Sequence, residues 1–252
     1  MDEIWKSAIT VVTGGAIWEG VKFISPEIKR FFESRKNAKE AFYKNLDPIL
    51  KVASELYGKL ESLAKEDFST FKNPNHSNSS DPVHNKKYIC FLFAQFWAQL
   101  EFLRLESQYI SLSKIRKGNE LLKFISTIES RSHRILDRSI QRIIGECLLY
   151  QKEQKFRVMT LNEFIIQIDD QSSNLHRWIA VLESKLTAAI TKEQRQPIMR
   201  FGIIVVALID HFDSSHKIAR ERNIYVNKLS EKNKRIIKNN WRMSFVSKRA
   251  KV

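Results

Sequence analysis

Residues 88–100 read YICFLFAQFWAQL, thirteen consecutive residues that carry no charge and include five aromatic side chains. A helix that is apolar on all sides belongs at the centre of a helical bundle rather than on its surface. The continuation to Leu112 is long enough to make this segment the central helix of such a bundle. We therefore predict that its core contains Phe91, Phe96, Trp97, Leu100 and Leu103.

Helical patterns continue on both sides of this segment. Only seven Gly and five Pro occur in 252 residues, so few positions interrupt a helix. Ser25-Pro26 and Asp47-Pro48 each match a helix start, and the helix that begins at Pro48 is expected to end near Phe71. Apolar spacing predicts further helices over about 88–112, 119–129, 132–150, 160–190 and 197–219.

One of these segments has an alternative. Residues 201–209 are rich in β-branched side chains and are compatible with a strand. Pro197 just before them, and the lack of partner strands, favour a helix. The sequence therefore predicts an all-α fold, a single multi-helix bundle with an apolar N-terminal helix and a basic C-terminal helical tail. Its parts are an apolar segment at 1–25, a bundle at 26–220 with a polar loop at 72–86, and a basic amphipathic tail at 221–252.

The N-terminal segment has two interpretations. Residues 7–18 carry no charge, but they number twelve, whereas a helix needs about 20 residues to cross a bilayer. Extension of the segment would bury Glu19 and Lys22 in lipid, which is unfavourable. The segment is then either a packed or interfacial helix, or a single span with the rest of the chain in the cytoplasm. Trp5 and Trp18 are candidates for membrane insertion.

Positive charge is concentrated at the other end of the chain. Between Arg222 and Val252 there are ten Lys or Arg and one Glu, so 31 residues carry +9 of a formal net charge of +15. Such an excess indicates a polyanionic partner, either an anionic membrane surface or a nucleic acid. The candidate contacts in the tail are Lys228, Lys232, Lys234, Arg235, Lys238, Arg242, Lys248 and Arg249.

The tail also has the pattern of a basic amphipathic helix. Ile237, Trp241 and Phe245 recur at steps of four, joined by Leu229 and Ile236. Trp241 and Phe245 are further candidates for membrane insertion, because a basic helix with embedded aromatic residues suits a membrane surface. The same residues suit stacking on nucleic acid. The remaining alternative is an ordinary terminal helix that docks on the bundle through its apolar residues.

A second basic feature lies within the predicted helix 132–150. On a helical wheel Arg131, Arg134, Arg138 and Arg142 fall within about 80° of one another. Guanidinium groups on one face suit bidentate contacts with phosphate. The alternative is a solvated face whose arginines pair with Glu146 or with a neighbouring helix.

Three segments resemble a widespread family of uncharacterised bacterial proteins. They are residues 46–60 (LDPILKVASELYGKL), residues 91–106 (FLFAQFWAQLEFLRLE) and residues 140–146 (IQRIIGE). The resemblance covers about 45–215 and implies a helical bacterial protein, often associated with a membrane. It implies no activity, and the basic tail has no counterpart in it.

No catalytic or metal-binding motif is present. Neither HExxH, nor a nucleophile–base arrangement, nor a Gly-rich phosphate loop occurs. None of the six histidines follows an arginine at the spacing used by helical ribonucleases. We therefore expect a protein that is not an enzyme and that uses no cofactor and no metal.

The sequence thus favours an intracellular helical interaction protein that associates with an anionic surface, most simply at the inner face of the cell membrane. One alternative is a nucleic-acid-binding subunit that uses the arginine stripe and the tail. Another, suggested by the resemblance, is a helical effector or regulatory subunit of a bacterial defence or toxin system. A protein partner or a second copy of the chain is also compatible with the sequence.

Overall fold

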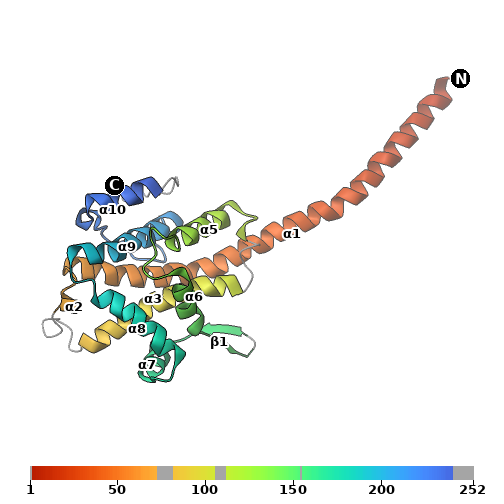
Figure 1. The fold of residues 1–252 in the computed structure, drawn as a ribbon. Coiled ribbons are helices and arrows are strands. Elements are labelled where there is room, and N and C mark those ends of the chain that lie inside the picture. Colours follow the sequence, from red (N-terminus) through yellow and green to blue (C-terminus); the bar gives the residue numbers. More distant parts are fainter. Residues whose placement is uncertain (1, 73–81, 106–111, 154, 241–252) are drawn as a thin grey trace.

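The computed structural model describes residues 2–72, 82–105, 112–153 and 155–240. Side chains are described from Glu33 onward, apart from a few beside these gaps. The described chain is mostly helical and contains one two-stranded sheet (Figure 1). The prediction of an all-α helical bundle is confirmed.

The elements follow one another along the chain, and Figure 1 labels most of them. They are α1 (Asp2–Lys65), α2 (Ser69–Lys72), α3 (Pro82–Leu105), α5 (Arg116–Ile128), α6 (Arg138–Cys147), β1 (Leu149–Lys152), β2 (Lys155–Val158), α7 (Leu161–Asp169), α8 (Asn174–Thr187), α9 (Lys192–Phe212), the 3-10 turn η2 (Val226–Lys228) and α10 (Glu231–Asn240).

Helices α1, α3 and α9 form the centre of the bundle. Helix α1 packs against both α3 and α9. Helix α3 meets α9 where the ring of Phe201 contacts those of Phe93 and Phe96, at centroid distances of 5.7 and 6.0 Å. The side chains predicted for the core, Phe91, Phe96, Trp97, Leu100 and Leu103, are all buried. The prediction that residues 88–100 belong to a central helix is confirmed.

The segment with a strand alternative is helical. Residues 201–209 lie within α9, and every one of them is buried. A helix apolar on all sides can exist there because α1, α3 and α5 surround it. Its start is set by a capping box, in which the side chains of Thr191 and Gln194 each bond the backbone amide of the other.

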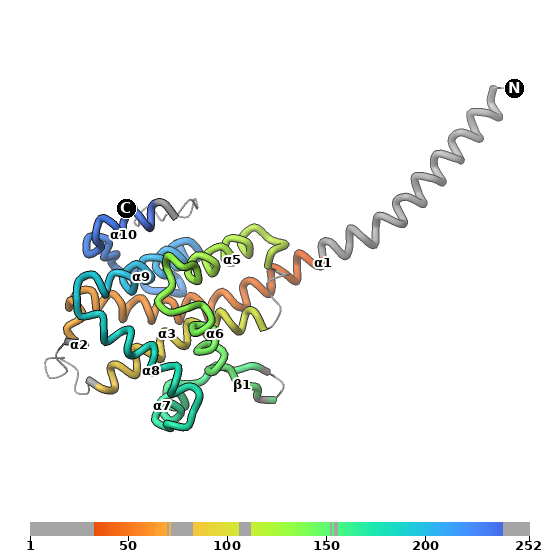
Figure 2. The backbone as a smooth tube through the Cα atoms, viewed as in Figure 1, coloured from red at the N-terminus to blue at the C-terminus, as the bar shows by residue number. Residues whose placement is uncertain are grey.

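The remaining helices cover this centre. Helix α6 packs on α3 and α8, α5 packs on α9 and α1, and α7 lies against α8 and α3. Helix α10 runs beside α9, as the tube in Figure 2 shows. The hairpin of β1 and β2 follows α6, with Leu149 paired to Val158 in antiparallel register.

Two predicted helix starts are wrong. Helix α1 continues through both Ser25-Pro26 and Asp47-Pro48. Pro48 has no amide hydrogen to donate within the helix, which normally favours a break. Its neighbours Leu46, Ile49 and Leu50 are buried, however, so tertiary packing on both sides of the proline keeps the helix continuous.

Other boundaries also differ from the prediction. The loop expected at 72–86 is helical from Pro82, and its residues 73–81 lie outside the described chain. The helix expected at 160–190 is two helices, because Asp170, Ser172 and Ser173 bond nearby backbone amides and side chains between them. The helix expected at 132–150 is only α6, followed by a hairpin whose four-residue strands are too short to show an alternating pattern.

Candidate anion-binding surface and pocket

The C-terminal helix α10 has one side on the bundle and one side in solvent. Asn233 and Ile237 are buried, as is Leu229 just before the helix. Lys232, Arg235 and Lys238, three residues apart, are exposed. Residues at this spacing lie on the same side of a helix. The predicted amphipathic helix therefore exists as far as Asn240, with its cationic side in solvent.

Two other predicted cations of the tail are engaged by carboxylates. Lys228 Nζ lies 3.4 Å from Asp67 Oδ1, and Lys234 Nζ lies 2.7 Å from Glu231 Oε1. The candidates Arg242, Lys248, Arg249, Trp241 and Phe245 lie outside the described residues, and so do the side chains of Trp5 and Trp18.

The apolar side of α10 packs on the protein rather than facing solvent. Leu229 is 4% exposed and Ile237 is 3% exposed, and both belong to the main core. The described part of this helix thus has the arrangement expected for a docked terminal helix. Its apolar residues hold it against α9, while its charged side stays accessible.

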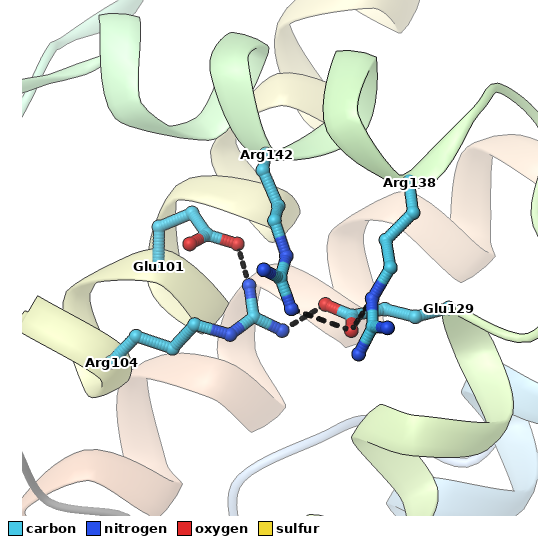
Figure 3. Close-up of polar contacts among 5 residues, drawn as sticks. All are labelled: Glu101, Arg104, Glu129, Arg138 and Arg142. Carbon is cyan, nitrogen blue, oxygen red and sulfur yellow. Dashed lines mark hydrogen bonds and ion pairs between the residues drawn. The ribbon is translucent and has the colours of Figure 1, made fainter.

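The expected arginine stripe is partly neutralised. Glu129, which is buried, lies among three guanidinium groups (Figure 3). Its Oε2 is 3.0 Å from Nε of Arg138 and 3.4 Å from Nη2 of Arg142. Its Oε1 contacts Arg104, which also pairs with Glu101. The cluster thus holds three cations and two carboxylates.

The electrostatics of this cluster favour the charged carboxylate. Burial alone would raise the pKa of Glu129, but the hydrogen bond and charge of Arg104, with smaller contributions from Arg142 and Arg138, lower it overall. The network contains Glu101 and Arg104 from α3, Glu129 from the end of α5, and Arg138 and Arg142 from α6. It therefore ties three helices together. We interpret it as a structural ion-pair network.

The other two arginines of the stripe are not on that helix. Because α6 begins at Arg138, Arg131 and Arg134 lie in the preceding turns, and the prediction of one four-arginine face is wrong. Arg131 is exposed, and Arg134 pairs with Asp137 at the helix start. The helical-wheel prediction was wrong because it assumed a helix from about residue 132, whereas α6 begins at Arg138.

A polar pocket lies between the start of α9 and the start of α10. Its volume is about 480 Å³. Its lining side chains come mainly from the first turns of these two helices: Lys192, Glu193, Gln196, Pro197, Arg200, Ser230, Lys232, Asn233 and Ile236. Helix N-termini carry partial positive charge, which adds to that of the lining lysines and arginine.

Hydrogen bonds fix the shape of this pocket. The side chain of Gln196, buried on α9, donates to the carbonyl oxygen of Lys228 at 3.3 Å and accepts from the amide of Ser230 at 2.8 Å. Asn233 Nδ2 donates to Ser230 Oγ at 2.8 Å. These bonds hold the segment before α10 against α9, so the pocket walls are positioned by the fold.

Arg200 is the unusual residue of this pocket. It is 9% exposed, its Nη1 donates to Asn233 Oδ1, and its buried Nε has no hydrogen-bond partner among the described residues. Burial lowers the pKa of Arg200, yet a guanidinium remains protonated in proteins. None of the ion pairs among the described residues involves Arg200, although burying an uncompensated charge costs several kcal/mol.

A buried histidine is also sensitive to this charge. His133 is 1% exposed, and its Nδ1 has no hydrogen-bond partner among the described residues. Burial, together with the positive charge of Arg200, lowers the pKa of His133 to about 4. His133 is therefore neutral at pH 7 and adds no second positive charge beside Arg200.

Sequence analysis did not identify Arg200, Glu129 or Arg104. Arg200 interrupts an otherwise apolar stretch between Ile198 and Ile209. Such a lone charge in a helix that is apolar on all sides is the signal that it is buried. Glu129 gave no comparable signal, because its partners lie far from it along the chain.

The described residues show no cluster suited to binding a metal ion. No group of three or more His, Cys, Asp or Glu among them is arranged to hold a metal ion. His211 contacts Glu120 at 3.0 Å, and the same carboxylate also pairs with Arg116. His216 contacts Asp210 at 3.6 Å. Within the described chain, helices sufficiently long and apolar to cross a membrane are also absent.

Comparisons with known proteins add no family or function. No protein-family model matches the chain, and searches of curated proteins and of solved structures likewise give no match. The resemblance to bacterial helical proteins therefore remains an expectation from the sequence.

Proposed function

We propose that this protein is a non-enzymatic helical interaction protein that binds an anionic membrane surface from the cytoplasm through its basic C-terminal region. The observation that carries the proposal is the exposed cationic side of α10, formed by Lys232, Arg235 and Lys238. The opposite side of this helix is anchored by Leu229 and Ile237. A fixed helix presents its charges together, which favours attachment to a charged surface.

The charge balance of the tail supports this proposal. After Glu231 the sequence contains no Asp or Glu, while Lys and Arg continue to Lys251. Cationic residues near an anionic bilayer each contribute about 1 kcal/mol at physiological ionic strength. Several such residues give strong attachment that weakens as salt screens the charges.

The cationic side of α10 is better suited to this role than the predicted arginine stripe. Arg138 and Arg142 share the buried carboxylate of Glu129, so part of their charge is offset. Arg235 and Lys238 form none of the ion pairs found among the described residues, and both are exposed. The hydrogen bond of Lys234 lowers the pKa of Glu231 most, and the charge of Arg235 also helps to lower it. The nucleic-acid alternative uses the arginine stripe and the tail, so it shares this side of α10 and is the rival outcome of the test below.

The experiment measures binding of the full chain to phosphatidylcholine vesicles with and without phosphatidylglycerol. We expect the double substitution Arg235→Gln and Lys238→Gln to weaken binding by roughly thirtyfold, since the two charges contribute about 2 kcal/mol. The matched control is Arg157→Gln with Lys185→Gln, which removes the same charge from exposed positions on β2 and α8. In Figure 1 the hairpin of β1 and β2 lies on the opposite side of the bundle from α10.

Equal losses in both double variants would show that only net charge matters and would contradict a role for α10. Tighter binding of the wild-type chain to duplex DNA than to these vesicles, at equal salt, would favour the nucleic-acid alternative. Trp241→Ala with Phe245→Ala tests the aromatic contribution without any change in charge, and the membrane proposal expects it to weaken vesicle binding.

A further inference from the structure

The pocket between α9 and α10 contains a cation that the described protein does not compensate. Arg200 lines this pocket and is nine-tenths buried. It forms no ion pair among the described residues, and its Nη1 donates to the neutral side-chain oxygen of Asn233. A buried charge without a counter-ion indicates a place for an anion.

The other charged groups of the pocket define the charge of that anion. Lys192 and Lys232 are exposed at its rim, on α9 and α10. Glu193 is the carboxylate that lines it, and it is also exposed. The formal charges of Arg200, the two lysines and Glu193 add up to +2. A phosphomonoester carries about −1.5 to −2 at pH 7, which matches this balance.

The size and the donors of the pocket point to the same ligand. A volume of about 480 Å³ exceeds that of a phosphate group and lies within the usual range for small-molecule sites. A guanidinium presents its N–H groups in a fork that fits two phosphate oxygens, and lysine ammonium groups add charge around it. The first turns of two helices contribute further positive potential.

We propose that the pocket between α9 and α10 binds the phosphate group of a phosphomonoester, with Arg200 as its principal ligand and Lys192 and Lys232 at its rim. The phosphomonoester is either a soluble small molecule or the headgroup of a lipid. This site differs from the cationic side of α10 in that it selects one phosphate group, whereas that side responds to surface charge.

The first test is calorimetric titration of the full chain with inorganic phosphate at constant ionic strength, with chloride as the reference anion. Wild-type protein is expected to bind one phosphate saturably. Arg200→Gln removes the guanidinium and should weaken binding by roughly ten- to a hundredfold, the usual effect of losing charged hydrogen bonds. Its matched control is Arg157→Gln, an exposed arginine on β2 that should bind as wild type does.

A second variant keeps the proposal testable if Arg200→Gln does not fold. Lys192→Gln changes an exposed side chain at the rim, on α9 and outside the cationic side of α10, and should weaken phosphate binding several-fold, whereas Lys185→Gln on α8 should not. Absence of saturable phosphate binding by the wild-type chain would overturn the proposal. So would equal weakening by the pocket variants and their controls, because this would indicate diffuse surface charge.

Two further ligands distinguish the sources of the phosphate group. Glycerol 3-phosphate represents a soluble phosphomonoester, and vesicles that contain phosphatidic acid present the same group on a lipid. If binding of glycerol 3-phosphate or of phosphatidic acid vesicles depends on Arg200, the result supports the site and identifies the source of the phosphate group. Vesicles that contain phosphatidylglycerol, a phosphodiester, should depend on Arg235 and Lys238 but not on Arg200, so failure of the membrane proposal and failure of this site give different results.

Discussion

The Nε atom of Arg138 lies 3.0 Å from Oε2 of Glu129, nine residues earlier in the chain. A side chain that a helical wheel assigns to an exposed basic face therefore contacts a buried carboxylate. The same carboxylate also contacts Arg104 and Arg142, so Glu129 connects α3, α5 and α6 (Figure 3). Its removal should affect stability more than any exposed carboxylate would.

Glu129→Gln should lower the free energy of unfolding by about 3 kcal/mol. The substitution leaves the mostly buried guanidinium of Arg104 with one carboxylate instead of two, and loss of one partner of a buried pair costs about 3–5 kcal/mol. We expect the lower end, because Arg138 and Arg142 remain hydrated. Denaturant unfolding measures this, with Glu146→Gln on the exposed side of α6 as the control. A cost similar to that of the control would contradict a structural role for Glu129.

The same carboxylate should make stability depend on acid pH. The pKa of Glu129 is lowered below its ordinary value of 4.5, so the folded protein binds this proton less readily than the unfolded chain. Its contribution is fully present above pH 4.5 and is lost as the pH falls through the lowered folded pKa. Unfolding measured from pH 6 to pH 3, in wild type and Glu129→Gln, should show the steeper loss in wild type. Parallel curves would rule out this source of acid sensitivity.

His133 should titrate far below an ordinary histidine. Burial and the charge of Arg200 lower its pKa from 6.5 to about 4. Between these two values the unfolded chain binds a proton that the folded protein does not, so His133 lowers stability as the pH falls. The imidazole C–H signals in an NMR titration give the folded pKa directly. A midpoint near 6.5 would mean that His133 is solvated and far from the charge of Arg200.

Trp97→Ala should cost about 3–5 kcal/mol, the usual range for a large side chain lost from a core. Trp97 is 2% exposed, and its ring lies 5.6 Å from that of Phe93. When the Gln141 amide is oriented to satisfy its neighbours, its oxygen also accepts from Trp97 Nε1 at 2.9 Å. Ile166→Ala, at an exposed position on α7, is the control in denaturant unfolding. A loss below about 1 kcal/mol would exclude a central position for Trp97.

Gly145→Ala should destabilise the contact between α6 and α3. A Cβ at this position would lie 2.9 Å from the backbone carbon and oxygen of Trp97, closer than such atoms approach. One of the two helices would have to move, which typically costs about 1–3 kcal/mol in a packed core. Thermal unfolding should show a lower midpoint, although alanine favours helix formation. An unchanged or higher midpoint would mean that the two helices separate at little cost.

Much of the fold could be predicted because its signals are local. The charge-free run at 88–100 and the apolar stretch at 201–209 indicated central helices, and both are buried. The boundaries were less accurate where packing opposes local preference, as at Pro48, which lies within α1. The hairpin after α6 gave no usable pattern, since each strand has four residues.

The candidate sites divide in the same way. The cationic side of α10 follows from a spacing of three residues, so the sequence predicts it as soon as the helix is identified. The partners of Arg138 and Arg142 do not follow from spacing, because Glu129 and Arg104 reach them from other helices. Arg200 is a lone charge in the sequence, and its pocket forms only where α10 folds back onto α9.

By itself the sequence determined the helical class, the central position of the apolar segments and the excess of positive charge in the tail. These properties depend on composition and on periodicity over a few turns, which a chain has before it folds. The tertiary structure decided which charges are paired, which one is buried without a carboxylate partner among the described residues, and which side of α10 meets solvent. The energy of a charge depends on its burial and on partners within a few ångströms, and those distances exist only in the folded chain.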